Sequence, residues 1–198
     1  DGGGFVRLIG HTGADGIRTT TDPEPVLAHG GPLVAHNGFG FDFLALARHH
    51  GFDLLEAGEQ GRLIDTMVLA SLKYPSAGGE GKRARREWGL NRLSEKILGQ
   101  EKTDGLKLLE KKHGGFDQIP VDDPTFLEYC GQDVNLTQQL LEHFCPGGQL
   151  TEYQQREMRL MARLTAGITV QGFRVDVDLV KQRIAEGERV KEEGFRWL

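Results

Sequence analysis

The alternation of apolar and polar residues predicts two strands near the start of the chain. Phe5–His11 and Ile17–Thr21 both alternate, and Thr12–Gly16 between them is rich in turn-forming residues. We therefore expect these two strands to form a hairpin. Leu33–His36 is a short apolar run with turn residues on both sides, which suits a buried strand.

Helical spacing of apolar residues begins soon after this run. One helix is expected from Phe41 onward. Leu63–Leu72 is expected to be a strand end that turns into a helix capped by Asp65. Asp42 would then lie in the first turn of a helix just beyond the carboxyl end of a strand, where α/β proteins usually place their sites.

The longest helix is expected between Asp123 and about Phe144. Asp123 suits the N-cap, and Pro124 suits the first helical position because no backbone N–H partner is needed there. Tyr129 and Asp133 are four residues apart, so they lie one above the other on the same side of this helix.

The chain beyond this helix is expected to form a second unit. Cys145–Gly148 breaks the helical pattern and indicates a boundary. Thr151–Ala166 is expected to be an amphipathic helix, Ile168–Asp176 a tight hairpin, and the residues after Asp178 a last helix.

Composition narrows the class of protein. Of the 198 residues, 38% are apolar and 27% are charged, which is typical of a globular protein. The net charge of −5 excludes a uniformly basic nucleic-acid-binding surface but permits a local basic patch. Two cysteines are too few for a disulfide framework or a zinc cluster, and no apolar run approaches the roughly 18 residues of a membrane helix. We therefore expect a cytoplasmic protein without a membrane partner.

Asp42 and Asp133 predict metal-assisted chemistry. Carboxylate oxygens are hard ligands suited to Mg²⁺ or Mn²⁺. Two such ions roughly 4 Å apart can activate a water molecule and stabilise the leaving oxygen of a phosphodiester. The hydroxyl of Tyr129 could orient that water, although a phenol with an ordinary pKa of about 10 is a poor base.

Four motifs, taken in order, resemble the 3′–5′ proofreading exonuclease domains of family-A DNA polymerases. Leu33–Asp42, which ends in Asn-x-x-x-Phe-Asp, is similar to the second exonuclease motif of that family, and Tyr129–Asp133 is similar to the third. Leu63–Thr66 and Gly89–Leu93 are similar to its linking elements. Glu157–Asp176 is similar to the segment that opens the polymerase domain. These exonucleases are of the ribonuclease-H-like DEDDy class, and the layout is closest to phage replicative polymerases.

The resemblance implies an α/β fold, in which a ribonuclease-H-like mixed β-sheet is flanked by helices and lacks its first strand. It implies an exonuclease domain over residues 1–148 and the helical start of a polymerase domain over residues 149–198. Asp42 and Asp133 would hold two Mg²⁺ or Mn²⁺ ions, and Tyr129 would complete the catalytic set. The reaction would be hydrolysis at a DNA 3′ end that releases nucleoside monophosphates. The partners would be the single-stranded primer end, the rest of the polymerase chain, and a processivity factor that the sequence does not identify.

Four further residues are expected to contact the substrate. Asn37 belongs to the second motif, and Phe39 is one of three phenylalanines suited to stacking on bases. Arg83 and Arg86 lie in a basic, glycine-rich segment suited to phosphates. Each also has a plainer interpretation: Asn37 as a turn residue, Phe39 as an aromatic residue of the core, and Arg83 and Arg86 as part of a solvated loop. Asp65 is interpreted as a helix cap rather than a ligand.

The family's first motif, Asp-x-Glu on a strand, supplies two of its four metal-binding acids and is expected before Phe5. Asp1 does not match, because no acid lies two residues further on. We therefore interpret the chain as a fragment of a longer protein, truncated at both ends. We expect the fragment to be inactive by itself and the full protein to hydrolyse DNA.

Two alternatives stay open. One is an RNase D-like exoribonuclease, against which the predicted hairpin at Ile168–Asp176 argues. The other is a non-catalytic scaffold that keeps the exonuclease fold to support a polymerase. Intact Asp42, Tyr129 and Asp133 argue against the scaffold, and the missing first motif argues for it.

Overall fold

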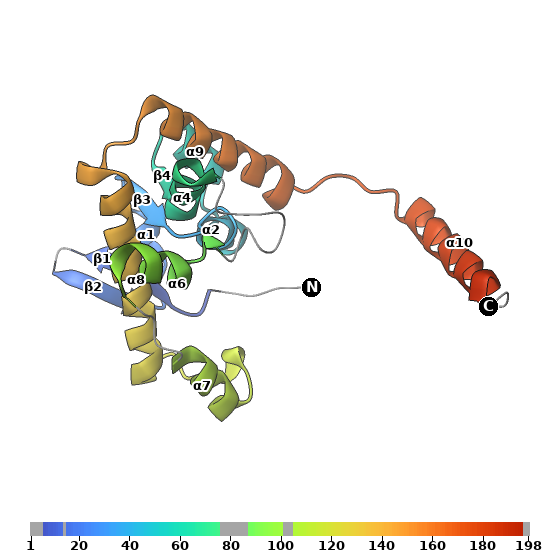
Figure 1. The fold of residues 1–198 in the computed structure, drawn as a ribbon, viewed down its shortest axis with the longest axis horizontal. Helices are drawn as coiled ribbons and strands as arrows, with labels where there is room; N and C mark the ends of the chain where they lie inside the picture. The colour runs from blue at the N-terminus through green and yellow to red at the C-terminus, as the bar shows by residue number, and fades with distance from the viewer. Residues whose placement is uncertain (1–5, 14, 76–86, 101–104, 196–198) are drawn as a thin grey trace.

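The computed structural model describes residues 6–13, 15–75, 87–100 and 105–195, and this part of the chain is mixed α and β (Figure 1). The strands are β1 (Ile9–Gly13), β2 (Gly16–Thr20), β3 (Leu33–Ala35) and β4 (Leu63–Asp65). The helices are α1 (Glu24–Leu27), α2 (Asp42–His50), α3 (Leu54–Glu59), α4 (Thr66–Lys73), α6 (Leu90–Leu93), α7 (Gly105–His113), α8 (Pro124–Phe144), α9 (Glu152–Leu164) and α10 (Val177–Phe195). Shorter helical turns are η2 (Ser94–Leu98), η3 (Phe116–Gln118), η4 (Pro146–Gly148) and η5 (Thr165–Val170). Within the described ranges, none of the helices has both the length and the apolar character needed to cross a membrane.

The described strands pair into two separate sheets of two strands each. β1 and β2 form the predicted antiparallel hairpin, but β1 begins at Ile9 and includes Thr12 and Gly13, which were predicted to be turn residues; Thr12 lies opposite Ile17. β3 and β4 are parallel, with Val34 opposite Ile64, so their carboxyl ends meet at one edge. The α/β class is therefore confirmed at this coarse level.

The β1–β2 hairpin packs against the middle of α8 (Figure 1). The closest approach is at Gly10, where a Cβ atom would lie 2.8 Å from both Cys130 Sγ and Val134 Cγ2. Real Cβ atoms essentially never come this close to another heavy atom. Gly10 thus allows the strand to lie directly on the helix.

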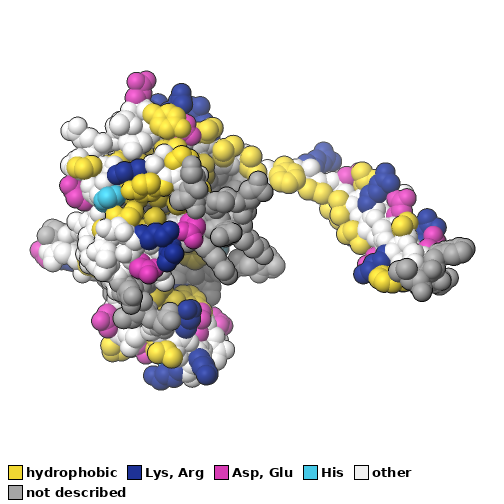
Figure 2. All heavy atoms as spheres, viewed as in Figure 1, with side chains coloured by type: hydrophobic (Ala, Val, Ile, Leu, Met, Phe, Trp, Pro, Cys, Tyr) yellow, Lys and Arg dark blue, Asp and Glu magenta, His cyan; other side chains and the backbone are white. Residues whose placement is uncertain are grey.

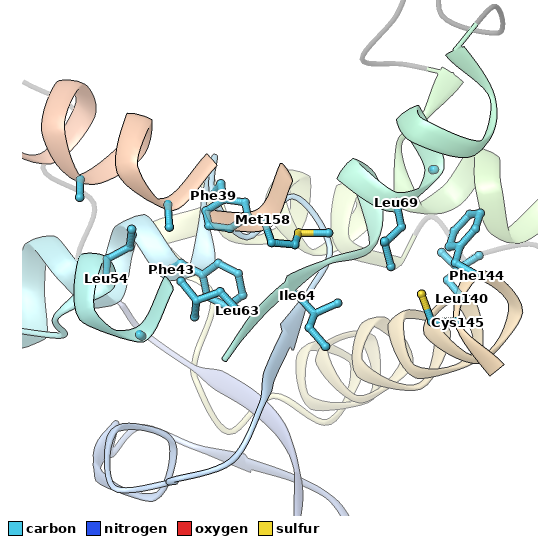
Figure 3. Close-up of a cluster of buried hydrophobic side chains, with 14 of the residues drawn as sticks. Phe39, Phe43, Leu54, Leu63, Ile64, Leu69, Leu140, Phe144, Cys145 and Met158 are labelled. Carbon is cyan, nitrogen blue, oxygen red and sulfur yellow. The ribbon is translucent and has the colours of Figure 1, made fainter. Parts of the chain in front are cut away.

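The main core surrounds β3 and β4 and joins α2, α3, α4, α9 and the second half of α8 (Figure 3). Its most buried large side chains include Phe43, Leu63, Leu69, Leu140 and Met158. A second group of buried residues, here called the small cluster, lies at the other end of α8. It consists of Leu109, Ile119 and Phe126, with Leu8 and Leu106 packed against them.

The C-terminal part differs from the sequence prediction in one respect. The expected hairpin at Ile168–Asp176 is wrong, because α9 continues without a break through η5 to Val170. The run Ile168–Val170 is β-branched and favours a strand, but Arg48 donates a 2.8 Å hydrogen bond to the Thr169 carbonyl and ties η5 to α2.

The predicted break after α8 is confirmed at η4, but it does not separate two cores. Met158 and Ala162 of α9 and Ala166 of η5 are buried in the main core. α10 buries no residue and stands away from the rest of the molecule (Figure 1). The domain boundary at residue 148 stays a prediction.

Candidate functional site

The carboxyl ends of β3 and β4 are joined by one buried acid, Asp65. Its Oδ1 accepts hydrogen bonds from the backbone N–H of Met67 at 2.8 Å and of Asn37 at 2.9 Å, and its Oδ2 accepts one from Phe39 at 3.2 Å. The predicted cap of α4 is confirmed, with Val68 as a weaker second donor. Burial raises the pKa of the Asp65 carboxyl, and these N–H groups offset part of the shift.

The bonds to Asn37 and Phe39 were not expected from the sequence. They tie the turn after β3 to the start of α4, so Asp65 fixes the path of the chain toward Asp42. The sequence held one indication of these hydrogen bonds. Parallel strands end at the same edge of a sheet, which brings the loops that follow them close together.

Asp42 is the first residue of α2, immediately after this braced turn. The turn needs a left-handed residue, and Asn37 takes that conformation with φ of 61°. The residue Asp42 is exposed, yet protein atoms crowd its carboxyl group. This crowding raises the pKa of Asp42 to about 6, and the negative charges of Asp65 and Asp133 contribute further. The backbone N–H of Asp42 acts in the opposite direction.

Tyr129 and Asp133 lie on α8 between its two hydrophobic groups. Asp123 caps the helix as predicted, accepting from Thr125 N at 2.9 Å. Phe126 enters the small cluster, and Leu140 enters the main core. Tyr129 and Asp133 fall between these two positions along the helix, and both are half-buried. The polar pair thus lies in the stretch of α8 between the two clusters, here called the seam, next to the residues Cys130 and Val134 that pack against β1.

Asp42 on α2 and Asp133 on α8 are close enough for the negative charge of Asp133 to contribute to the raised pKa of Asp42. Like charges brought together in a crowded position favour protonation or the binding of a cation. Carboxylates are the type of ligand that a hard divalent cation prefers, but two carboxylates are fewer ligands than such an ion takes. Among the described residues, no group of three or more His, Cys, Asp or Glu side chains is arranged to hold a metal ion.

The four residues predicted to contact the substrate differ in their structural surroundings. Phe39 is only 4% exposed and packs edge-on against Phe43 at 5.3 Å, so the base contact predicted for Phe39 is corrected to a role in the core. Phe41 is 71% exposed instead. Asn37 serves as the turn residue, and its contact with substrate stays a prediction. Arg83 and Arg86 lie outside the described residues.

No protein-family model, curated protein or solved structure matches the chain. The site is therefore defined by its own residues and their surroundings.

Proposed function

We propose that the chain is the proofreading 3′–5′ exonuclease region of a family-A DNA polymerase, with a ribonuclease-H-like fold. The observation that supports this most is that the negative charge of Asp133 contributes to the raised pKa of Asp42. These two acids belong to motifs far apart in the sequence: Asp42 begins α2 after the turn that follows β3, and Asp133 lies one helical turn from Tyr129 on α8. Structural caps alone give no reason for this arrangement, because Asp65 and Asp123 already cap α4 and α8.

The negative charges of Asp42 and Asp133 favour the binding of divalent cations. Asp42 and Asp133 would hold Mg²⁺ or Mn²⁺, together with acids of the first motif. When bound, such ions supply Lewis-acid stabilisation of a leaving oxygen. The Tyr129 hydroxyl orients the attacking water with a hydrogen bond. Water adds to the terminal phosphorus and loses a proton to solvent. The bond between that phosphorus and the 3′ oxygen of the preceding nucleotide breaks, the oxygen takes up a proton from solvent, and a nucleoside monophosphate leaves.

One experiment with two readouts tests this function. Mn²⁺ binding to the 198-residue chain is followed by water-proton relaxation, and Mg²⁺-dependent trimming of 5′-labelled single-stranded DNA is followed on gels with the full-length protein. We expect Asp42→Asn and Asp133→Asn each to weaken Mn²⁺ binding about tenfold or more and to reduce trimming by at least about 100-fold. Asp178→Asn on α10, which removes the same charge, is the matched control. The isolated chain is expected to bind Mn²⁺ without trimming.

The same assay separates the alternatives. Faster trimming of RNA than of DNA would favour an RNase D-like exoribonuclease. A scaffold would show neither Mn²⁺ binding that depends on Asp42 and Asp133 nor trimming of either strand. Equal Mn²⁺ affinity in wild type and in the two site variants would overturn the proposal.

A further inference from the structure

One half of the surface of α7 presents three lysines to solvent. Lys107 and Lys111 are four residues apart and Lys112 follows, so the three lie within one half of the helix circumference. All three are exposed, while Leu109 on the other side is buried in the small cluster. Figure 2 shows lysine or arginine side chains at the end of the body formed by α7, beside hydrophobic and acidic ones.

An exposed aromatic ring lies next to this helix. Phe116 in η3, which follows α7, is 44% exposed, and its inner edge packs against Phe126 with ring centroids 5.6 Å apart. The guanidinium of Arg7 lies 5.7 Å from the centre of the Phe116 ring and donates hydrogen bonds to the carbonyls of Phe116 and Ile119. The ring is therefore held in place while part of its surface faces solvent.

The small cluster fixes this unit on the side of α8 that carries Tyr129 and Asp133. Phe126, Tyr129 and Asp133 follow one another at spacings of three and four residues, so they share one side of the helix. The rise from Phe126 to Asp133 is about 10 Å, a distance that a few nucleotides of a single DNA strand can span. A strand whose end lies at the acids and which runs along this side of α8 reaches α7.

We propose that residues 105–119, the α7–η3 unit, bind the single-stranded DNA a few nucleotides before its 3′ end. This rests on the proposed function, whose substrate it would position. Lys107, Lys111 and Lys112 contact phosphates, and Phe116 stacks on a base. Cations that follow the backbone together with an aromatic platform form the combination that single-stranded nucleic acid requires. Glu110 and Asp117, the two acids of the unit, limit the attraction to the lysine side of α7.

Binding rather than hydrolysis tests the inference. The 198-residue chain is titrated against a labelled oligo(dT) of about 12 nucleotides, a length within the usual site sizes, in EDTA, and fluorescence anisotropy is read at several salt concentrations. Replacing Lys107, Lys111 and Lys112 with alanine is expected to weaken binding about tenfold near 0.1 M salt. The slope of log affinity against log salt is expected to fall by about 2, or about 0.7 per lost phosphate contact. Phe116→Leu, which keeps apolar bulk against Phe126, is expected to weaken binding several-fold with an unchanged salt slope.

The matched control removes three cations from α10. Lys181, Arg183 and Lys191 are replaced with alanine, which changes the net charge equally, and affinity is expected to stay within about twofold, as for other exposed charges far from a site. Equal weakening in both triple variants would overturn the inference, because net charge alone would then explain it. Undiminished affinity in the α7 variant would also overturn it. Neither result depends on Mn²⁺ binding or trimming, so failure of the proposed reaction is recognised separately.

Discussion

α8 and α10 are the two longest helices among the described residues, and their surroundings are opposite. α8 has 21 residues and buries five of them, including Leu136 and Leu140. α10 has 19 residues and buries none, with Ile184 56% exposed. Both sequences have apolar residues at helical spacing. The comparison shows that this spacing predicts a helix, whereas burial depends on which elements pack against it.

The largest effect is expected from Leu140→Ala in the main core. Leu140 is fully buried, so its truncation leaves a cavity and should destabilise the protein by about 2–5 kcal/mol. Ile184→Ala removes a comparable side chain from α10, where exposed substitutions usually change stability by less than about 0.5 kcal/mol. Urea denaturation followed by tryptophan fluorescence measures both. Similar losses of stability in the two variants would mean that α10 is packed in solution and that α8 and α10 do not differ in burial.

A smaller effect is expected from replacing the helix-capping acids Asp65, at the start of α4, and Asp176, at the start of α10. Asp65 accepts four backbone N–H groups, whereas Asp176 accepts one, from Leu179 at 3.0 Å, at the start of α10. Asp65→Ala leaves buried donors without a partner and should lower the free energy of unfolding by about 2–3 kcal/mol. Asp176→Ala should only reduce the helicity of α10.

Circular dichroism and thermal unfolding distinguish these two outcomes. If Asp65→Ala and Asp176→Ala lower the unfolding midpoint equally, Asp65 acts as a simple cap and does not brace the turn before Asp42. A larger loss for Asp65→Ala than for Asp176→Ala would show that the cooperative contacts lie around β3 and β4 rather than in α10.

The smallest effect is a pH dependence carried by Asp42. Its folded-state pKa of about 6 lies above the ordinary value of 3.8, so the folded protein binds more protons between these values. Stability from this group is therefore greatest below pH 3.8 and falls as the pH rises to about 6. Because the residue is exposed, we expect a change no larger than about 1 kcal/mol.

Asp42→Asn should remove this decline, and Asp178→Asn on α10 should leave it unchanged. Chemical denaturation of the three proteins between pH 4 and pH 7 measures the difference. Parallel stability curves for the wild type and Asp42→Asn would show that the raised pKa of Asp42 is absent in solution.

The parts of the fold that the sequence predicted well are those controlled by neighbouring residues. The caps at Asp65 and Asp123 and the β1–β2 hairpin depend on residues within a few positions of each other, and all three are confirmed. The segment after α9 was wrong for the opposite reason. Its conformation involves the hydrogen bond from Arg48 to Thr169, which lies 121 residues away in the chain.

In the candidate site, too, the sequence predicted the local features and not those that depend on distant residues. The positions of Asp42 and Asp133 at or along helices followed from the sequence, but the seam between the two clusters did not. Phe126 and Leu140 belong to one continuous helical pattern, and nothing in that pattern indicates that they enter different clusters. Likewise, Phe39 and Phe41 have similar sequence surroundings, and only the geometry of the turn buries one ring and exposes the other.

The division of buried residues along α8 has a consequence for local unfolding. The main core and the small cluster have no buried residue in common, and α8 is the long element that enters both. Units of this kind can open one at a time, as separate foldons, because opening the smaller one exposes little of the larger. The α7–η3 unit can then open while the main core keeps the backbone at Asp42 in place.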